Sequence, residues 1–191
     1  MEKRQMYLNT LSHIIKALAM WQDPQAAVSL ILQDVKTALE VKGSSLLMVK
    51  EKTGELEVIM SQGLSDSYLH KGPVSASRLS AAGTPDSPVL IQDAANDPRA
   101  QYPEAAMQEG IASILSIPII VRKITIGALR IYTAQPWTPT DDDLNFTQAA
   151  AQLAGMALEM SRLNSTPDKP PRQATAAKSQ TWEIYPANNE G

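Results

Sequence analysis

Apolar residues recur at steps of three and four near the start of the chain, which predicts two helices. The first helix has one stripe of Leu8, Leu11, Ile15 and Leu18. The second has Val28, Ile31, Val35 and Leu39 on one face. Asp23 followed by Pro24 is typical of a helix start, and Lys42-Gly43 is predicted to end this second helix.

A third amphipathic helix is predicted from Asp141 to about Leu163. Its apolar seam has heptad spacing and consists of Phe146, Ala150, Leu153, Ala157 and Met160. Thr140 and Asp143 have the spacing of a capping box with Asp in place of Glu. Three consecutive aspartates point in different directions from a helix and suit its positive end better than a metal ion.

Between the helical ends, the pattern changes to that of a β-sheet. Residues 111–132 are mostly β-branched or aliphatic and predict two long central strands joined at a tight, charged Val121-Arg122-Lys123 corner. Residues 44–50 and 55–61 predict a hairpin, and the second of its strands places Leu56, Val58 and Met60 on one face. The sheet is therefore expected to be antiparallel.

The middle of the chain is less regular. Residues 62–87 are rich in Ser, Gly, Pro and Ala with weak periodicity, as in a binding loop. Residues 89–91 predict a short buried strand, and residues 104–109 predict a short helix that Gly110 ends. Because these segments lie between the two predicted hairpins, they could cover one face of the sheet.

Composition limits the chemistry that the chain can carry. The net charge of −3 offers no basic field for nucleic acid or an anionic membrane, and no apolar run is long enough to span a bilayer. The absence of Cys excludes disulfides, thiolate metal sites and cysteine nucleophiles. Only two histidines, His13 and His70, are present, so we expect no metal site and no catalytic residues. We also expect a cytoplasmic protein.

A change in composition divides the chain into two parts. Residues 1–163 are predicted to form one domain, and residues 164–191 form a polar tail that contains Pro. The tail ends in a small apolar island around Trp182 and Ile184. We expect this island to pack back on the domain, although it could equally be unattached.

Several short phrases, in this order and spacing, resemble the GAF domain family. They are Gly54-Glu55-Leu56, Gly63-Leu64, Pro88-Val89-Leu90-Ile91-Gln92-Asp93, Asp97-Pro98-Arg99, Glu109-Gly110-Ile111-Ala112-Ser113, Ile117-Pro118-Ile119 and Ile126-Gly127-Ala128-Leu129-Arg130-Ile131-Tyr132. The resemblance implies an α+β fold similar to that of PAS domains. In the fold that this resemblance implies, an antiparallel sheet has the N- and C-terminal helices on one face. A pocket, covered by loops and a short helix, lies on the other face.

The resemblance also implies which ligands to expect. Members of the family bind cyclic nucleotides, bilins, haem, amino acids or keto acids, and many only mediate dimerisation. Without Cys, this chain can neither attach a bilin covalently nor act as the free methionine sulfoxide reductases of the family do. The Asn-Lys pair of cyclic-nucleotide-binding members is replaced by Tyr132-Thr133. The expected ligand is therefore an unidentified small molecule.

Strand alternation supplies the first candidate binding residues. If Leu129 and Ile131 face the helices, then Arg130 and Tyr132 face the pocket, where the guanidinium could bind a carboxylate or phosphate at two points. The alternative for Arg130 is an exposed edge or an ion pair with an acid in a loop. The remaining candidates are Asp93, Arg99, Tyr102, Ser113 and Tyr68. Turn formation, backbone hydrogen bonds or plain surface packing are the alternatives for these.

Three functions remain open at this point. The first is a regulatory, non-catalytic domain of signal transduction that senses a small molecule. The second is a dimerisation or adaptor module without a ligand, and the third is an enzyme. We expect a parallel homodimer through the Leu8–Leu18 and Phe146–Met160 helices, with a signalling protein as a further partner. No nucleic acid or membrane is expected as a partner.

Overall fold

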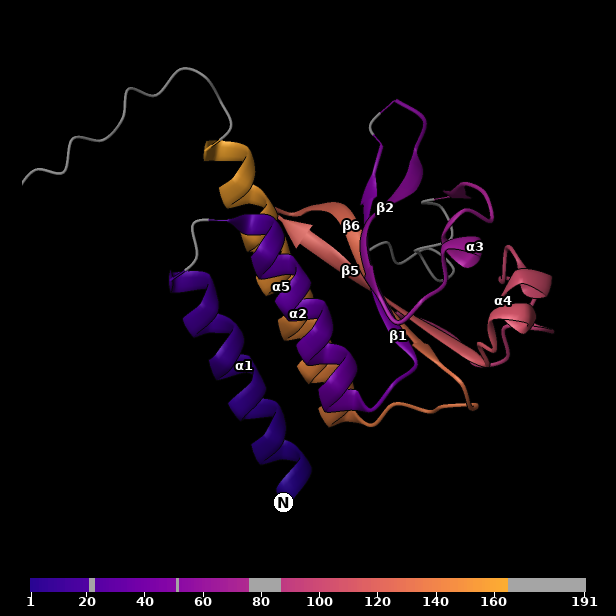
Figure 1. The fold of residues 1–191 in the computed structure, drawn as a ribbon, viewed down its shortest axis with the longest axis horizontal. Helices are drawn as coiled ribbons and strands as arrows, with labels where there is room; N and C mark the ends of the chain where they lie inside the picture. Colours follow the sequence, from indigo (N-terminus) through magenta and orange to yellow (C-terminus); the bar gives the residue numbers. More distant parts are fainter. Residues whose placement is uncertain (21–22, 51, 76–86, 165–191) are drawn as a thin grey trace, which may run out of the picture.

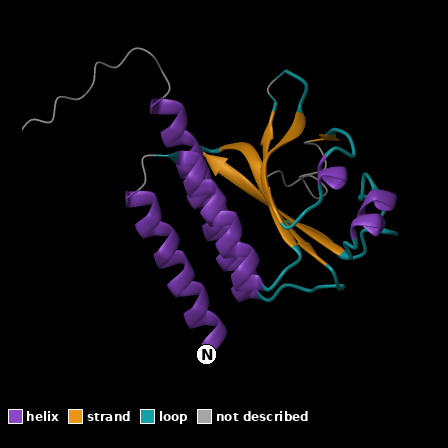
Figure 2. Cartoon of the chain, in the orientation of Figure 1, coloured by secondary structure: helices purple, strands orange, loops and turns teal. Residues whose placement is uncertain are grey.

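A computed structural model of the chain describes residues 1–20, 23–50, 52–75 and 87–164. Figures 1 and 2 show how its helices and strands are arranged. In chain order, the elements are α1 (Glu2–Met20), α2 (Pro24–Leu39), β1 (Gly43–Val49), β2 (Glu55–Gln62), α3 (Asp66–Leu69), β3 (Val74–Ser75), β4 (Val89–Ile91), α4 (Pro103–Glu109), β5 (Ser113–Val121), β6 (Ile124–Thr133) and α5 (Asp141–Asn164).

The strands form one antiparallel sheet in the order β3-β2-β1-β6-β5-β4, which confirms the predicted α+β class. The long helices α1, α2 and α5 lie together on one side of this sheet, and the short helices α3 and α4 lie on the other (Figure 1). Within the described residues, no helix is long and apolar enough to cross a membrane. The predicted tail with its Trp182 island and residues 76–86 of the irregular stretch lie outside the described residues.

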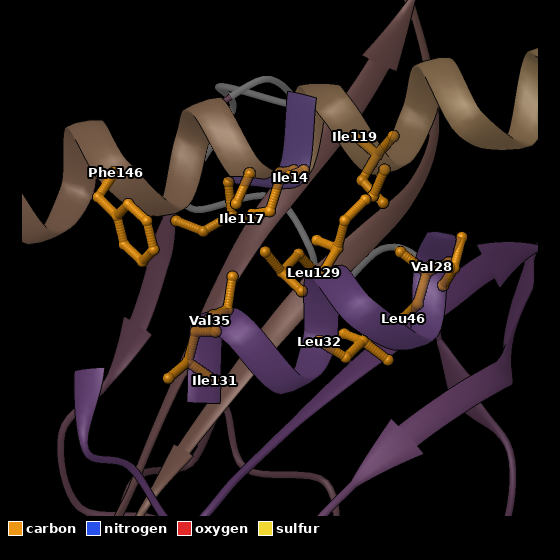
Figure 3. Close-up of a cluster of buried hydrophobic side chains, with 14 of the residues drawn as sticks. Ile14, Val28, Leu32, Val35, Leu46, Ile117, Ile119, Leu129, Ile131 and Phe146 are labelled. Atoms are coloured by element: carbon orange, nitrogen blue, oxygen red, sulfur yellow. The ribbon is translucent and has the colours of Figure 1, made fainter. Parts of the chain in front are cut away.

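The main hydrophobic core lies between the sheet and the long helices (Figure 3). From β6, Leu129 and Ile131 enter this core, and both are fully buried. They pack there with residues of α1, α2, β1, β5 and α5, among them Ile14, Val28, Leu32, Val35, Leu46, Ile117, Ile119 and Phe146. Beyond the register irregularity at Ile126, the expected alternation is present, and Ala128, Arg130 and Tyr132 face the other side of the sheet.

The apolar stripe of α1 is divided between the core and the surface. Leu11 and Leu18 pack against the core, whereas Leu8 and Ile15 are 56% and 53% exposed. The predicted single stripe is therefore divided: Leu11 and Leu18 belong to the chain's own core, and Leu8 and Ile15 remain available for the predicted dimer contact. The reason is Tyr7, whose ring stacks on Phe146 at a centroid distance of 4.3 Å and turns its own side of the helix inward.

The start of α5 forms the predicted capping box. Thr140 N donates to Asp143 Oδ2 at 2.9 Å, and Asp143 N donates to Thr140 Oγ1 at 3.3 Å. Asp143 is buried and also accepts a 2.6 Å hydrogen bond from the Tyr7 hydroxyl. Its carboxylate forms an ion pair with Lys3 at 2.9 Å. Although burial opposes it, these donors hold the pKa of Asp143 below its usual range. The aspartate run thus attaches α1 to α5.

Two local predictions about the strands need correction. Gly43 does not end α2, because Glu40 caps this helix at a φ of 53° and Gly43 begins β1. In β2, a bulge beside Leu46 and Leu47 changes the alternation, so that Val58 packs on the cavity side of the sheet and Met60 on the helix side. The corner at Arg122 and Lys123 is a two-residue hairpin with φ values of 51° and 68°, as predicted from its length.

Candidate ligand-binding site

A small cavity lies on the face of the sheet opposite the long helices. Among the described residues that line it are Tyr68, Lys71, Arg99, Tyr102, Ile114 and Arg130. They come from β5, β6, the α3 region and the segment that leads into α4. Its volume is about 30 Å³, which is room for roughly two water molecules. A group of a few heavy atoms fits this space, and a larger ligand would extend out of it.

Arg130 lies at the floor of the cavity on a central strand. Its backbone pairs with Ser116 of β5 on one side and with Ser45 of β1 on the other. Because both neighbours are small, the long side chain of Arg130 can lie over the sheet between them. The residue is only 8% exposed, and its Nε donates to Ser116 Oγ at 3.0 Å.

The two terminal nitrogens of the Arg130 guanidinium are the polar atoms of most interest. In the described part of the chain, they donate to no protein group, and no carboxylate lies within ion-pair distance. Every fully buried side-chain nitrogen or oxygen there has a hydrogen-bond partner, so these nitrogens must remain in contact with the cavity. The alternative of an exposed edge or of a loop acid as partner does not apply within these residues.

Lys71 is the second cation of the cavity. Its Nζ donates to the backbone oxygen of Tyr68 at 2.9 Å and lies 3.7 Å from the centre of the Tyr68 ring. Burial, and secondly the positive charge of Arg130, lower the pKa of Lys71 to about 8. The two cations are therefore close enough to repel each other.

Tyrosine rings form part of the cavity wall. Tyr68 is 3% exposed and meets the ring of Tyr132 edge to face at a centroid distance of 5.8 Å. Burial raises the pKa of the Tyr68 phenol far above its usual range. Tyr132 shares a 2.9 Å hydrogen bond with Ser45, and the Tyr102 hydroxyl donates to Pro73 O at 2.6 Å. Tyr132 therefore packs against Tyr68 and is not among the described residues that line the cavity, whereas Tyr102 lines it.

The other predicted residues have different surroundings. Arg99 lines the cavity, but its guanidinium binds both carboxylate oxygens of Asp97 and the carbonyl oxygen of Leu90. Asp93 forms a turn by accepting from the backbone and side chain of Asn96. The structure does not place Asp93 among the cavity residues, and the carboxylate already has its donors.

Ser113 lies on the opposite side of its strand from the cavity. Its hydroxyl donates to Gln92 O at 2.7 Å and accepts from Trp137 N at 3.0 Å, so it connects two loops. Ser116, three residues later, has the parity that faces Arg130. Within the described ranges, no group of three or more His, Asp or Glu side chains could hold a metal ion.

Lys71 is the charged residue, among those described around the cavity, that sequence reasoning missed. It follows His70 in a loop, where no periodicity indicates a direction. A weak signal is Gly72 at a φ of 129°, where a Cβ would lie 2.6 Å from the Tyr102 hydroxyl. Such a close approach requires Gly and brings Lys71 beside the Tyr102 segment, but it is visible only in three dimensions.

Comparisons with known proteins identify the type of domain. The family model described as "GAF domain" matches residues 23–158. No curated protein gives a match. Among solved structures, the chain is similar to the GAF domain of a phosphoenolpyruvate-protein phosphotransferase from Coxiella burnetii, with 20% identity, 84% of this chain and 97% of that chain covered, and a TM-score of 0.73.

Two other solved structures have the same fold. A free methionine-R-sulfoxide reductase from Neisseria meningitidis, solved in complex with its substrate, has 17% identity over 85% of this chain and 93% of that chain, with a TM-score of 0.69. A domain of a putative two-component sensor histidine kinase protein from Sinorhizobium meliloti has 17% identity over 74% of this chain and 94% of that chain, with a TM-score of 0.62. At these identities, the likeness concerns the fold alone.

Proposed function

The chain belongs to the GAF domain family, and from this premise we propose that it is a regulatory domain that senses a small molecule in the cavity above Arg130. The ligand carries at least one negatively charged group, which the guanidinium of Arg130 binds. Binding changes the arrangement of α3 and α4 over the sheet, and the domain passes this change to a signalling partner. The protein is expected to act in the cytoplasm.

One observation carries this proposal: a buried arginine that faces a cavity without a carboxylate partner among the described residues. Removing a charge from water costs several kcal/mol unless an opposite charge or a full set of hydrogen bonds replaces the water. Among the described residues, the side chain of Arg130 has one hydrogen-bond acceptor, the Ser116 hydroxyl. A fold that accepts this cost at the centre of its sheet is best explained by a ligand that supplies the missing acceptors.

A route for the signal exists through the central strand. Arg130 touches the cavity, while its neighbours Leu129 and Ile131 are fully buried against the long helices. A small displacement of β6 would therefore be felt in α5 and α1, provided that the ligand binds one arrangement more tightly than the other.

The homodimer is part of the same proposal. Phe146, Ala150 and Ala157 are buried within the chain's own core, so α5 offers Met156 and Met160 to a second copy. From α1, the exposed apolar residues are Leu8 and Ile15. A second copy that packs against these side chains would join the terminal helices of both protomers and give the signal an output.

A non-catalytic role is favoured over an enzymatic one. The chain has no Cys, and the described cavity residues include no pair of nucleophile and base. The adaptor alternative requires an unused cavity, for which a buried cation without an acid is a poor lining. Arg130 therefore favours the sensor over the adaptor.

A ligand screen with two variants tests the proposal. Thermal shift with small carboxylates, phosphates and amino acids is followed by calorimetry on the purified protein and on its R130M and R122M variants. A true ligand at a hundred times its Kd adds about 2.7 kcal/mol, or roughly 5–10 °C in Tm for a chain of this size. R130M should abolish the shift, whereas R122M, at the exposed hairpin corner, should retain it. No shift with any compound, or equal shifts in R130M, would contradict the proposal.

A further inference from the structure

We propose that the cavity takes a small oxyanion with two negative charges, of the phosphate or sulfate type, held between the guanidinium of Arg130 and the ammonium of Lys71. The inference rests on the proposed sensor function and deepens it, because it names the charge and size of the ligand. It also assigns a binding role to Lys71.

The charges that line the cavity do not balance. Of its three cations, Arg99 is neutralised by Asp97, with which it forms a two-point ion pair. Neither Arg130 nor Lys71 forms an ion pair within the described residues. The described residues that line the cavity therefore carry an excess of two positive charges.

The acid whose field reaches Lys71 is already engaged. Glu109 of α4 favours the charged form of Lys71, but its carboxylate lies 3.7 Å from Lys42 and accepts hydrogen bonds from Ser65 N and Ser65 Oγ. It stabilises the junction of α3 and α4 instead of filling the cavity. Among the described residues, neither Arg130 nor Lys71 has a carboxylate partner, so we assign that role to a ligand.

Charge and volume together select the class of ligand. A monoanion would neutralise one of the two cations, whereas a dianion neutralises both and removes their mutual repulsion. The cavity of about 30 Å³ holds roughly two water molecules, so the two charges must lie on one compact group. Arg favours the planar, two-point binding of such oxyanions, and Lys adds a point charge.

Proton linkage gives the proposal a distinctive signature. Lys71 faces Arg130 of β6, Glu109 of α4, Tyr68 of α3 and the Tyr102 segment. Tyr68 stays protonated because its phenol pKa is strongly raised. With a pKa of about 8, Lys71 loses its charge between pH 7 and pH 9 in the empty protein. A dianion raises this pKa, so binding takes up a proton, and affinity falls by about tenfold from pH 7 to pH 9.

Calorimetry with inorganic anions tests this at two pH values. Sulfate is the dianionic probe, because its charge does not change over this range, and nitrate is the monoanionic probe. Titrations use the intact protein and its R130M, K71M, K71Q and K50M variants. K71Q retains a donor for the carbonyl oxygen of Tyr68 in case K71M does not fold. Lys50 pairs with Glu57 on the exposed β1–β2 hairpin and provides the matched control.

The intact protein and K50M should bind sulfate more tightly than nitrate, with the tenfold loss at pH 9. In K71M and K71Q, sulfate should bind about tenfold more weakly at pH 7, a loss of ~1.4 kcal/mol, and should lose its pH dependence. If K71Q binds sulfate like the intact protein at both pH values, or if nitrate binds as tightly as sulfate, the two-cation inference is wrong while the Arg130 sensor stands. If R130M also binds both anions normally, the sensor proposal fails as well.

Titrations with inorganic phosphate, a small phosphomonoester and malonate then separate the sources of the charge. Phosphate or the phosphomonoester binding with the same Lys71 dependence supports a compact tetrahedral group. Malonate places its two charges on separate carboxylates. Preferred binding of malonate over sulfate and phosphate would overturn the inference of one compact dianion.

Discussion

Replacing Arg130 with Met should make the ligand-free protein more stable while it removes ligand binding. Arg130 is 8% exposed. Within the described part of the chain, its side chain has one hydrogen-bond acceptor, Ser116 Oγ. Residues kept for folding show the opposite behaviour, because their removal lowers stability. The sign of the change therefore distinguishes a binding residue from a structural one.

The expected magnitude follows from two opposing contributions. Replacing buried charged groups by apolar side chains of similar volume is neutral or stabilises a protein by up to about 1–4 kcal/mol. The Ser116 hydroxyl loses its donor, which costs about 1 kcal/mol. The net expectation for R130M is a gain of about 1 kcal/mol in the free energy of unfolding, or roughly 2–4 °C in Tm. Loss of the repulsion between Arg130 and Lys71 acts in the same direction.

Urea unfolding of protein freed of small molecules by dialysis measures this change. R99M is the matched control, because Arg99 lines the same cavity but is paired with Asp97 and bonded to Leu90 O. R99M should lower the free energy of unfolding by about 0.5–1.5 kcal/mol. A loss of 2 kcal/mol or more in R130M would show that Arg130 supports the fold, and the reasoning about an unsatisfied cation would be refuted.

Three further predictions concern the helices and the sheet. Y7F should lower the free energy of unfolding at pH 7 by about 1–3 kcal/mol, since it removes a donor from buried Asp143. Because the folded-state pKa of Asp143 is depressed, this penalty should shrink as the pH falls below about 4, which urea melts at several pH values would detect. G127A should prevent or severely weaken folding, as judged by circular dichroism, because a Cβ at Gly127 would lie 2.1 Å from a carbonyl oxygen of β1. The double variant L8Q/I15Q should leave the Tm within about 2 °C but shift light-scattering mass from dimer to monomer, and an unchanged mass would exclude these side chains as the interface.

The sequence was sufficient for the order of the long helices, of β1, β2 and β4–β6 and of α4, and for the side of β6 on which Arg130 lies, but the short elements α3 and β3 lie in a stretch that was predicted to be irregular. Strict alternation fixes the direction of each side chain where the register is regular, as it is from Gly127 to Thr133 of β6, so Leu129 and Ile131 predict the position of Arg130. In β2, the same logic failed at Met60, because the bulge beside Leu46 and Leu47 shifts the register. A bulge of this kind has no local sequence signal here.

Features that depend on packing between distant segments were not predictable. Helix α1 carries two overlapping apolar stripes, and only the stacking of Tyr7 on Phe146 decides which one is buried. The role of Lys71 depends on two other residues. Tyr68 lies three residues before it, and Arg130 lies in a strand far along the chain. A loop lysine has no periodicity that could reveal such neighbours.

The central claim is that the charged floor of the cavity binds a small anion, and mapping of backbone amide shifts by NMR tests it most directly. Sulfate and phosphate are titrated into uniformly ¹⁵N-labelled protein at pH 7. We predict saturable shifts that cluster at Lys71, Ser116 and Arg130, and that disappear in R130M. Shifts confined to exposed cations such as Arg122 and Lys123, or no saturable shifts at all, would contradict the account.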